Sequence, residues 1–91
     1  MTEATLEKYI VARVKKLGGI TYKFTSPSRR AVPDRIVIFP GGRIGFIELK
    51  APGKKPSELQ QFEMEKIENM GCSVIWADDK RTVDLFLYQL L

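Results

Sequence analysis

The sequence predicts a small α/β domain, and three features of the 91-residue chain lead to that class. Two short apolar runs are joined by Pro40-Gly41-Gly42 within residues 32–50, which is the pattern of a β-hairpin. Apolar residues at helical spacing precede this hairpin. A strand–helix–strand pattern includes its second run and extends beyond it, and such a unit makes a parallel strand pair. The predicted sheet is therefore mixed.

The first element is a helix over residues 2–17, predicted from four apolar residues at helical spacing: Leu6, Ile10, Val14 and Leu17. Thr2 is the expected N-cap, and Gly18-Gly19 ends the helix. Residues 20–25 then alternate between apolar and polar side chains. This alternation predicts a strand with one wetter face, near the edge of the sheet.

The turn chemistry of the hairpin predicts its register. A three-residue loop commonly holds a type I turn followed by a residue at positive φ, and Pro40 and Gly42 suit its first and last positions. This loop places Asp34 opposite Glu48, with Lys50 on the same face two residues later. A two-residue loop would put the two acids on opposite faces. Because Ile, Val, Phe and Leu surround them, we expect the hairpin to be buried on both faces.

Two carboxylates that meet beside apolar strands are costly unless something compensates them, and a divalent cation is one such group. The hard oxygens of Asp34 and Glu48 suit Mg²⁺ or Mn²⁺. The chain has no His and a single Cys, Cys72. Imidazole catalysis, His-ligated metals, an intrachain disulfide and a cysteine-based zinc site are therefore excluded.

The second half predicts a helix over residues 57–70, a buried strand over 72–77 and a last helix over 80–91. Ser57 and Gln60 fit a capping box at the start of the first of these helices, and Asp78 or Asp79 would cap the second. The last helix is apolar over much of its surface. Either this surface closes a thin core, or the excess forms a homodimer interface.

The charge balance favours a polyanionic partner. Lys and Arg number 15 against 11 Asp and Glu, which gives a net charge of +4. Five basic residues near the hairpin are candidates for phosphate contacts, with a solvated surface as the alternative for each: Lys23, Arg29, Arg30, Lys54 and Lys55. Neither a signal peptide nor a membrane span is visible, so we expect an intracellular protein.

Pro33-Asp34 followed by Glu48-Leu49-Lys50 resembles the motif of the PD-(D/E)XK nucleases. The closer resemblance is to the VRR-NUC branch of that superfamily, in its small stand-alone and often phage-encoded members, and covers about residues 3–79. It is carried by an ordered set of matching segments: Gly18-Gly19, residues 23–34, Pro40-Gly41-Gly42, residues 48–54 and Ser57-x-x-Gln60. Ala31 departs from the pattern, because relatives often carry Gly before the Val-Pro-Asp segment.

The resemblance implies a restriction-endonuclease-like αβββαβα core over residues 1–91, with a small mixed four-stranded sheet flanked by helices. It implies that the backbone carbonyl of Leu49 joins Asp34 and Glu48 as a ligand of Mg²⁺ or Mn²⁺. Lys50 would position water or stabilise phosphate charge. Glu7 matches an active-site acid on the first helix, and Glu3 is the alternative residue for that role. Without the resemblance, Glu7 reads as an exposed acid on the helix surface. Gln60 matches an active-site amide, although the capping box already accounts for it.

The implied activity is metal-dependent hydrolysis of phosphodiester bonds in DNA. Relatives of this kind act on branched DNA such as Holliday junctions, usually as homodimers, and a phage-encoded member would work in the cytoplasm of the host cell. A general nuclease acting on flaps or single strands is the alternative among enzymes. The alternative of another class is a non-catalytic module that binds DNA structures.

Overall fold

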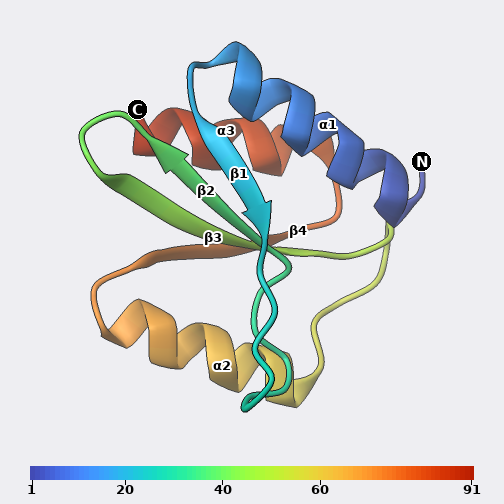
Figure 1. Ribbon diagram of the computed structural model, residues 1–91. Coiled ribbons are helices and arrows are strands. Elements are labelled where there is room, and N and C mark those ends of the chain that lie inside the picture. Colours follow the sequence, from blue (N-terminus) through green and yellow to red (C-terminus); the bar gives the residue numbers. More distant parts are fainter.

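A computed structural model describes residues 1–91 and confirms the predicted fold class. In chain order the elements are α1 (Glu3–Lys16), β1 (Ile20–Lys23), β2 (Arg35–Phe39), β3 (Arg43–Leu49), α2 (Glu58–Asn69), β4 (Ser73–Ala77) and α3 (Lys80–Leu90) (Figure 1). The strands form one sheet in the order β1-β2-β3-β4. Only β3 and β4 run parallel, and α2 connects them, so the sheet is mixed as expected.

The helices begin at the predicted caps. The backbone N–H of Thr5 donates to the Thr2 hydroxyl (3.1 Å), and that of Thr82 donates to the Asp79 carboxylate (2.7 Å). Ser57 and Gln60 form the complete capping box of α2. Each cap satisfies N–H groups that have no partner within the helix. Of the two aspartates considered for α3, Asp79 is the cap.

The predicted hairpin register is confirmed. Ile36 pairs with Phe46 and Ile38 with Ile44, as the three-residue loop requires. The turn itself differs from the expected type, because Gly41 as well as Gly42 has a positive φ, at 89° and 72°. A positive φ at the third residue of a turn belongs to type II, and glycine adopts it without strain.

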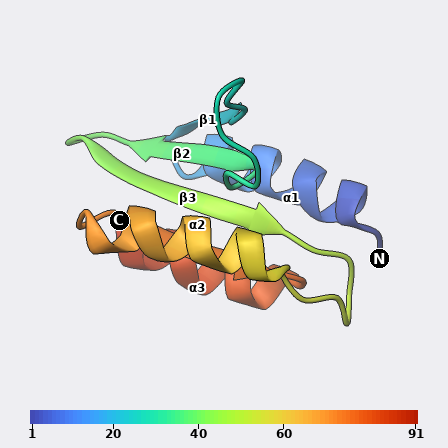
Figure 2. The same ribbon diagram turned by 90° about the horizontal axis from the view of Figure 1, so that it is seen from below.

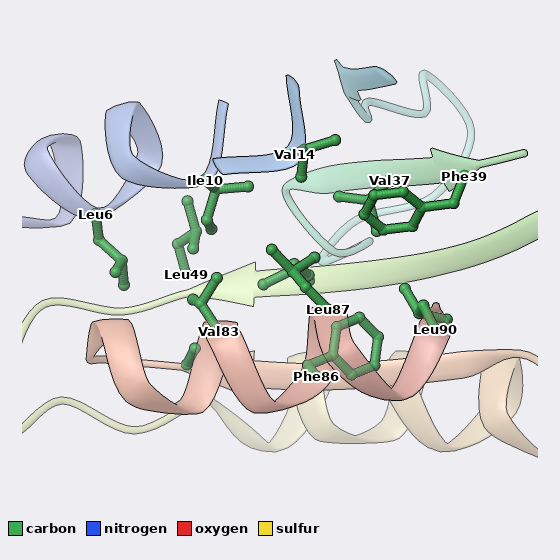
Figure 3. Packing of buried hydrophobic residues seen from close by; sticks show 12 residues of the cluster. Leu6, Ile10, Val14, Val37, Phe39, Leu49, Val83, Phe86, Leu87 and Leu90 are labelled. Atoms are coloured by element: carbon green, nitrogen blue, oxygen red, sulfur yellow. The ribbon is translucent and has the colours of Figure 1, made fainter. Parts of the chain in front are cut away.

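The core lies on one face of the sheet, between the strands and the pair α1 and α3 (Figures 1 and 3). Leu6, Ile10 and Val14 project from α1 at helical spacing towards it. From the other elements it receives Val37, Phe39, Ile47, Leu49, Ala77, Val83, Phe86, Leu87 and Leu90. At Gly45 an added Cβ would lie 2.7 Å from a Leu90 methyl carbon, so glycine allows α3 to approach β3 closely.

The expectation that the hairpin is buried on both faces is wrong. Val37 and Phe39 are buried, but Ile36 and Ile38 on the opposite face are only half-buried, and Ile44 is exposed. The reason is the position of α2, which packs on β4 and crosses neither β2 nor β1 (Figure 2). One face of the first three strands therefore has no helix over it.

The apolar surface of α3 mostly closes the core. Its Val83, Phe86, Leu87 and Leu90 are buried in the cluster, which leaves Leu85, Tyr88 and Leu91 exposed. The Tyr88 hydroxyl accepts a hydrogen bond from Arg13 of α1. The apolar excess on this helix is thus smaller than its sequence suggests. None of the three helices combines the length and hydropathy needed to cross a membrane.

Candidate active site

Asp34, Glu48 and Lys50 come together at the end of the hairpin opposite its turn. Asp34 directly precedes β2, Glu48 lies near the end of β3, and Lys50 follows that strand. The backbone N–H of Leu49 donates to Oδ2 of Asp34 (2.8 Å), so this carboxylate is fixed against the end of β3. Nζ of Lys50 lies 3.5 Å from Oε2 of Glu48. The hairpin register therefore produces the two acids and the ammonium group as one cluster.

The Glu48 carboxylate is held in an unfavourable place. Only 2% of the residue is exposed, and this burial, followed by the negative charge of nearby Asp34, raises the pKa of Glu48 to about 7. The ammonium group of Lys50 offsets part of that increase. Two carboxylates that repel each other, incompletely compensated by one lysine, leave room for a further positive charge.

A cleft of about 340 Å³ opens beside Asp34, between α1 and the end of the sheet. It is lined by seven residues: Glu3, Ala4, Glu7, Lys23, Thr25, Asp34 and Leu49. Both candidate acids of the first helix thus border the same cleft as Asp34. Glu7 is held there by buried Arg35, whose guanidinium lies 3.2 Å from the Glu7 carboxylate and also donates to the hydroxyl of Thr21 (3.3 Å).

The loop between β1 and β2 is tied to α2. Arg29 donates to the carboxylate of Glu63, and this carboxylate is buried on the inward side of α2 while Arg29 is exposed. Further along the loop, Ala31 has a φ of 63°. That conformation costs an alanine energy that a glycine avoids. The segment that delivers Asp34 is therefore strained at one residue and anchored at another.

Comparison with known proteins identifies the family. The chain is 49% identical over 78 residues to the "Putative nuclease p44" of Acyrthosiphon pisum secondary endosymbiont phage 1, a match that covers 86% of this chain and 84% of that protein. A solved structure described as a VRR_NUC domain superposes with a TM-score of 0.87 at 31% identity, over 97% of both chains. No family model matches the sequence. The chain belongs to the VRR-NUC family. Both comparisons place it among nucleases.

Within this VRR-NUC fold, Gln60 stands where the capping interpretation puts it. Its Oε1 accepts from the backbone N–H of Ser57 (2.9 Å), and its own N–H donates to the Ser57 hydroxyl (3.1 Å). In this conformation the carbonyl end of the amide is occupied by the cap. A role in the reaction is left to the NH₂ end, for which no protein acceptor is present.

The five basic residues predicted to contact phosphate differ in whether an acid already compensates their charge. Lys23 borders the cleft, and Arg30, Lys54 and Lys55 are exposed on the loops that enter β2 and leave β3. Arg29 is also exposed, but Glu63 already compensates its charge. The four residues other than Arg29 are the ones left with exposed charge for phosphate oxygens.

Two residues that hold the surroundings of the site in place were not predicted from the sequence. Arg35 had no assigned role, although it holds Glu7, and Glu63 was not considered at all. A signal for Glu63 existed, because it lies three residues after Gln60 on the side of the helix that also carries Ile67. A carboxylate on an inward side requires a partner. Its partner, however, lies 34 residues away, where no local pattern points.

The protein groups that could hold a metal here are few. No three His, Cys, Asp or Glu side chains gather closely enough to do so by themselves. Asp34 and Glu48 supply two carboxylates, and the backbone of Leu49 lies beside Asp34. Such an all-oxygen set, incomplete by itself, suits Mg²⁺ or Mn²⁺, which keep several water ligands.

Proposed function

We propose that this VRR-NUC protein is a metal-dependent DNA endonuclease that hydrolyses phosphodiester bonds. The observation that carries the proposal is the meeting of half-buried Asp34 with buried Glu48, where burial and the negative charge of Asp34 raise the pKa of Glu48 to about 7. Two carboxylates placed this way destabilise the metal-free fold, so a purely structural role does not account for them. A site that binds a cation does.

Asp34, Glu48 and the carbonyl of Leu49 would hold Mg²⁺ or Mn²⁺. The bound ion would relieve charge on the reacting phosphate and lower the pKa of a water ligand. Asp34 keeps its orientation through the hydrogen bond from Leu49, so this ligand is fixed before substrate arrives.

Lys50 lies close to Glu48 and is partly exposed, so it can reach outward to substrate. We assign it to positioning the attacking water and stabilising the charge that develops on the phosphate. We assign no general-base role to Lys50, because its ammonium group pairs with Glu48. Glu7, bordering the same cleft, would orient further water around the metal.

The substrate we propose is branched DNA, cut by a homodimer. This rests on the resemblance to stand-alone relatives and on the exposed cations Lys23, Arg30, Lys54 and Lys55 around the cluster. Two active sites related by a two-fold axis would make paired cuts in a two-fold-symmetric junction.

The test is nicking of end-labelled four-way, flap, splayed-arm and linear DNA by the purified chain with Mg²⁺, Mn²⁺ or EDTA. We expect nicking only with metal and fastest on the four-way junction. Lys50→Ala should slow nicking by about 10²–10³-fold while junction binding stays within about twofold. Lys16→Ala, an exposed lysine at the far end of α1, is the matched control and should cut normally.

The outcomes separate the alternatives. Equal cutting of all four substrates would show a general nuclease. A preference for the flap or splayed-arm substrate would show a nuclease that acts on flaps or single strands. Tight binding by the wild type with no cutting in either metal would identify a module that only recognises DNA structure. An electron-density or anomalous signal for Mn²⁺ between Asp34 and Glu48 would test the metal site directly.

A further inference from the structure

The uncovered face of the sheet is a continuous apolar surface. Two cross-strand rows lie on it, one of Ile20, Ile38 and Ile44 and the other of Tyr22, Ile36 and Phe46. Phe24 extends the surface at one end, with its ring centroid 5.7 Å from that of Phe46. These seven residues are named the open sheet face. No helix packs on it, because α2 contacts β4 instead (Figure 2).

The exposure of this face is large for a chain of this length. Tyr22 is 58% exposed, Ile20 52% and Ile44 46%, and the other four members are partly exposed. With about 150–250 Å² for a whole aromatic side chain, the seven together expose on the order of 500 Å². That matches the largest patches on monomers, which are often functional, and supplies most of the roughly 800 Å² that one partner contributes to a standard interface.

The chemistry of the face selects its occupant. Neither row contains a charged side chain, although the chain carries 26 charged residues in all, 15 basic and 11 acidic. A polyanion gains little from such a surface. Of its three aromatic rings only Tyr22 is mostly exposed, and its four isoleucines do not stack on bases. An uncharged apolar surface is complementary to itself, which a two-fold contact between identical chains requires.

We propose that two copies of this chain pack against each other through the open sheet face. This names the contact surface of the homodimer in the proposed function and rests on that part of it. It also replaces α3 as the expected interface, since most of the apolar surface of α3 lies inside the core. Asp34 and Glu48 follow the two rows at one end by strand alternation, so both active sites lie beside the contact.

Sedimentation equilibrium of the purified chain across micromolar concentrations tests the proposal. The wild type should sediment as a dimer of the 10.4 kDa chain. The double variant Ile20→Thr/Ile44→Thr keeps β-branched residues in the strands. It removes four apolar side chains per dimer, each contributing about three- to fivefold, and should weaken dimerisation by about 10²–10³-fold.

The matched control changes the other exposed apolar surface. Leu85 and Leu91 are 54% and 44% exposed on and after α3, close to the values for Ile20 and Ile44. Leu85→Gln/Leu91→Gln should remain a dimer. Circular dichroism melting of all three proteins verifies that each is folded, and Tyr22→Thr provides a second variant of the face if the double variant unfolds.

A wild type that is monomeric at all concentrations, or dissociation by the α3 variant alone, would overturn the proposal. So would sheet variants that stay dimeric but lose junction binding, since the face would then contact DNA. The nicking assay is read separately. If the sheet variants break the dimer and the wild type does not cut DNA, the interface is supported and the nuclease activity is refuted. If the wild type cuts DNA and the sheet variants leave the dimer intact, the nuclease activity is supported and the interface is refuted.

Discussion

Glu48→Gln in the metal-free protein should make the protein more stable at pH 8, although it removes a proposed active-site residue. The buried Glu48 carboxylate has a pKa of about 7 against an ordinary value of 4.5. Between these values the folded protein binds a proton that the unfolded chain has released. Stability contributed by the protonated group is therefore present at low pH and is lost as the pH rises towards and through 7.

The size of the effect follows from the same two values. At about 1.36 kcal/mol per pKa unit, the wild type should lose about 2–3 kcal/mol of unfolding free energy between pH 5 and pH 8. Because Glu48 is almost fully buried, water screens little of this cost. The neutral amide of Gln carries no such penalty, so its stability should change by less than about 1 kcal/mol over the same range.

The assay is urea unfolding at pH 5 and pH 8 in EDTA, followed by the fluorescence of Trp76, the single tryptophan, which pairs with Glu48 across β3 and β4. Circular dichroism is the second probe. Glu65→Gln, an exposed acid on α2, is the control and should keep the pH dependence of the wild type. Adding Mn²⁺ at about 100 times its Kd should then return about 2.7 kcal/mol to the wild type and to Glu65→Gln, but much less to Glu48→Gln.

Two results would refute this reasoning. A wild-type stability that rises from pH 5 to pH 8 in EDTA would mean that Glu48 is not the strained acid that its surroundings indicate. A loss of stability in Glu48→Gln at pH 8 would show that its carboxylate is compensated within the chain, and the argument for a cation would lose its main support.

Three other changes have expected outcomes. Ala31→Gly should raise the unfolding free energy by about 1 kcal/mol by removing the strain at φ 63°, and no gain in urea unfolding would contradict that strain. Arg29→Ala should cost about 1–3 kcal/mol because it leaves buried Glu63 unpaired. Adding Glu63→Gln should recover most of this loss, as a double-mutant cycle would measure. Gln60→Glu should retain the capping box and stability but nick DNA at least about tenfold more slowly, and an unchanged rate would restrict Gln60 to capping.

The hairpin shows which parts of this structure a sequence determines locally. Side chains alternate with a period of two, so the number of residues in the Pro40-Gly41-Gly42 loop decides which residues pair across the strands. The meeting of Asp34 and Glu48 follows from that count alone. The helix caps at Thr2 and Asp79 are likewise local, since each side chain bonds an N–H three residues later.

The missed features all depend on how separate elements pack. Whether Ile36 and Ile38 are covered is decided by the path of α2, and an apolar strand pattern looks the same with or without a helix over it. The pairing of Arg29 with Glu63 joins a loop to a helix in the same way. Which part of the apolar surface of α3 lies inside the core is likewise decided by the packing of that helix on β3, where Gly45 allows a close approach.

The hydrogen bond from the Leu49 backbone to Asp34 gives Asp34 a structural role that Glu48 lacks, so the two acids should be conserved for different reasons. Asp34 accepts the Leu49 N–H at the open end of the hairpin, as a main-chain carbonyl would. A related protein that has lost nuclease activity would therefore still gain stability from keeping this aspartate. Glu48 bonds no main-chain group; its ion pair with Lys50 offsets only part of the cost of its burial. Among sequences of this type, we expect inactive lineages to be marked by a neutral residue at position 48 while an aspartate persists at position 34.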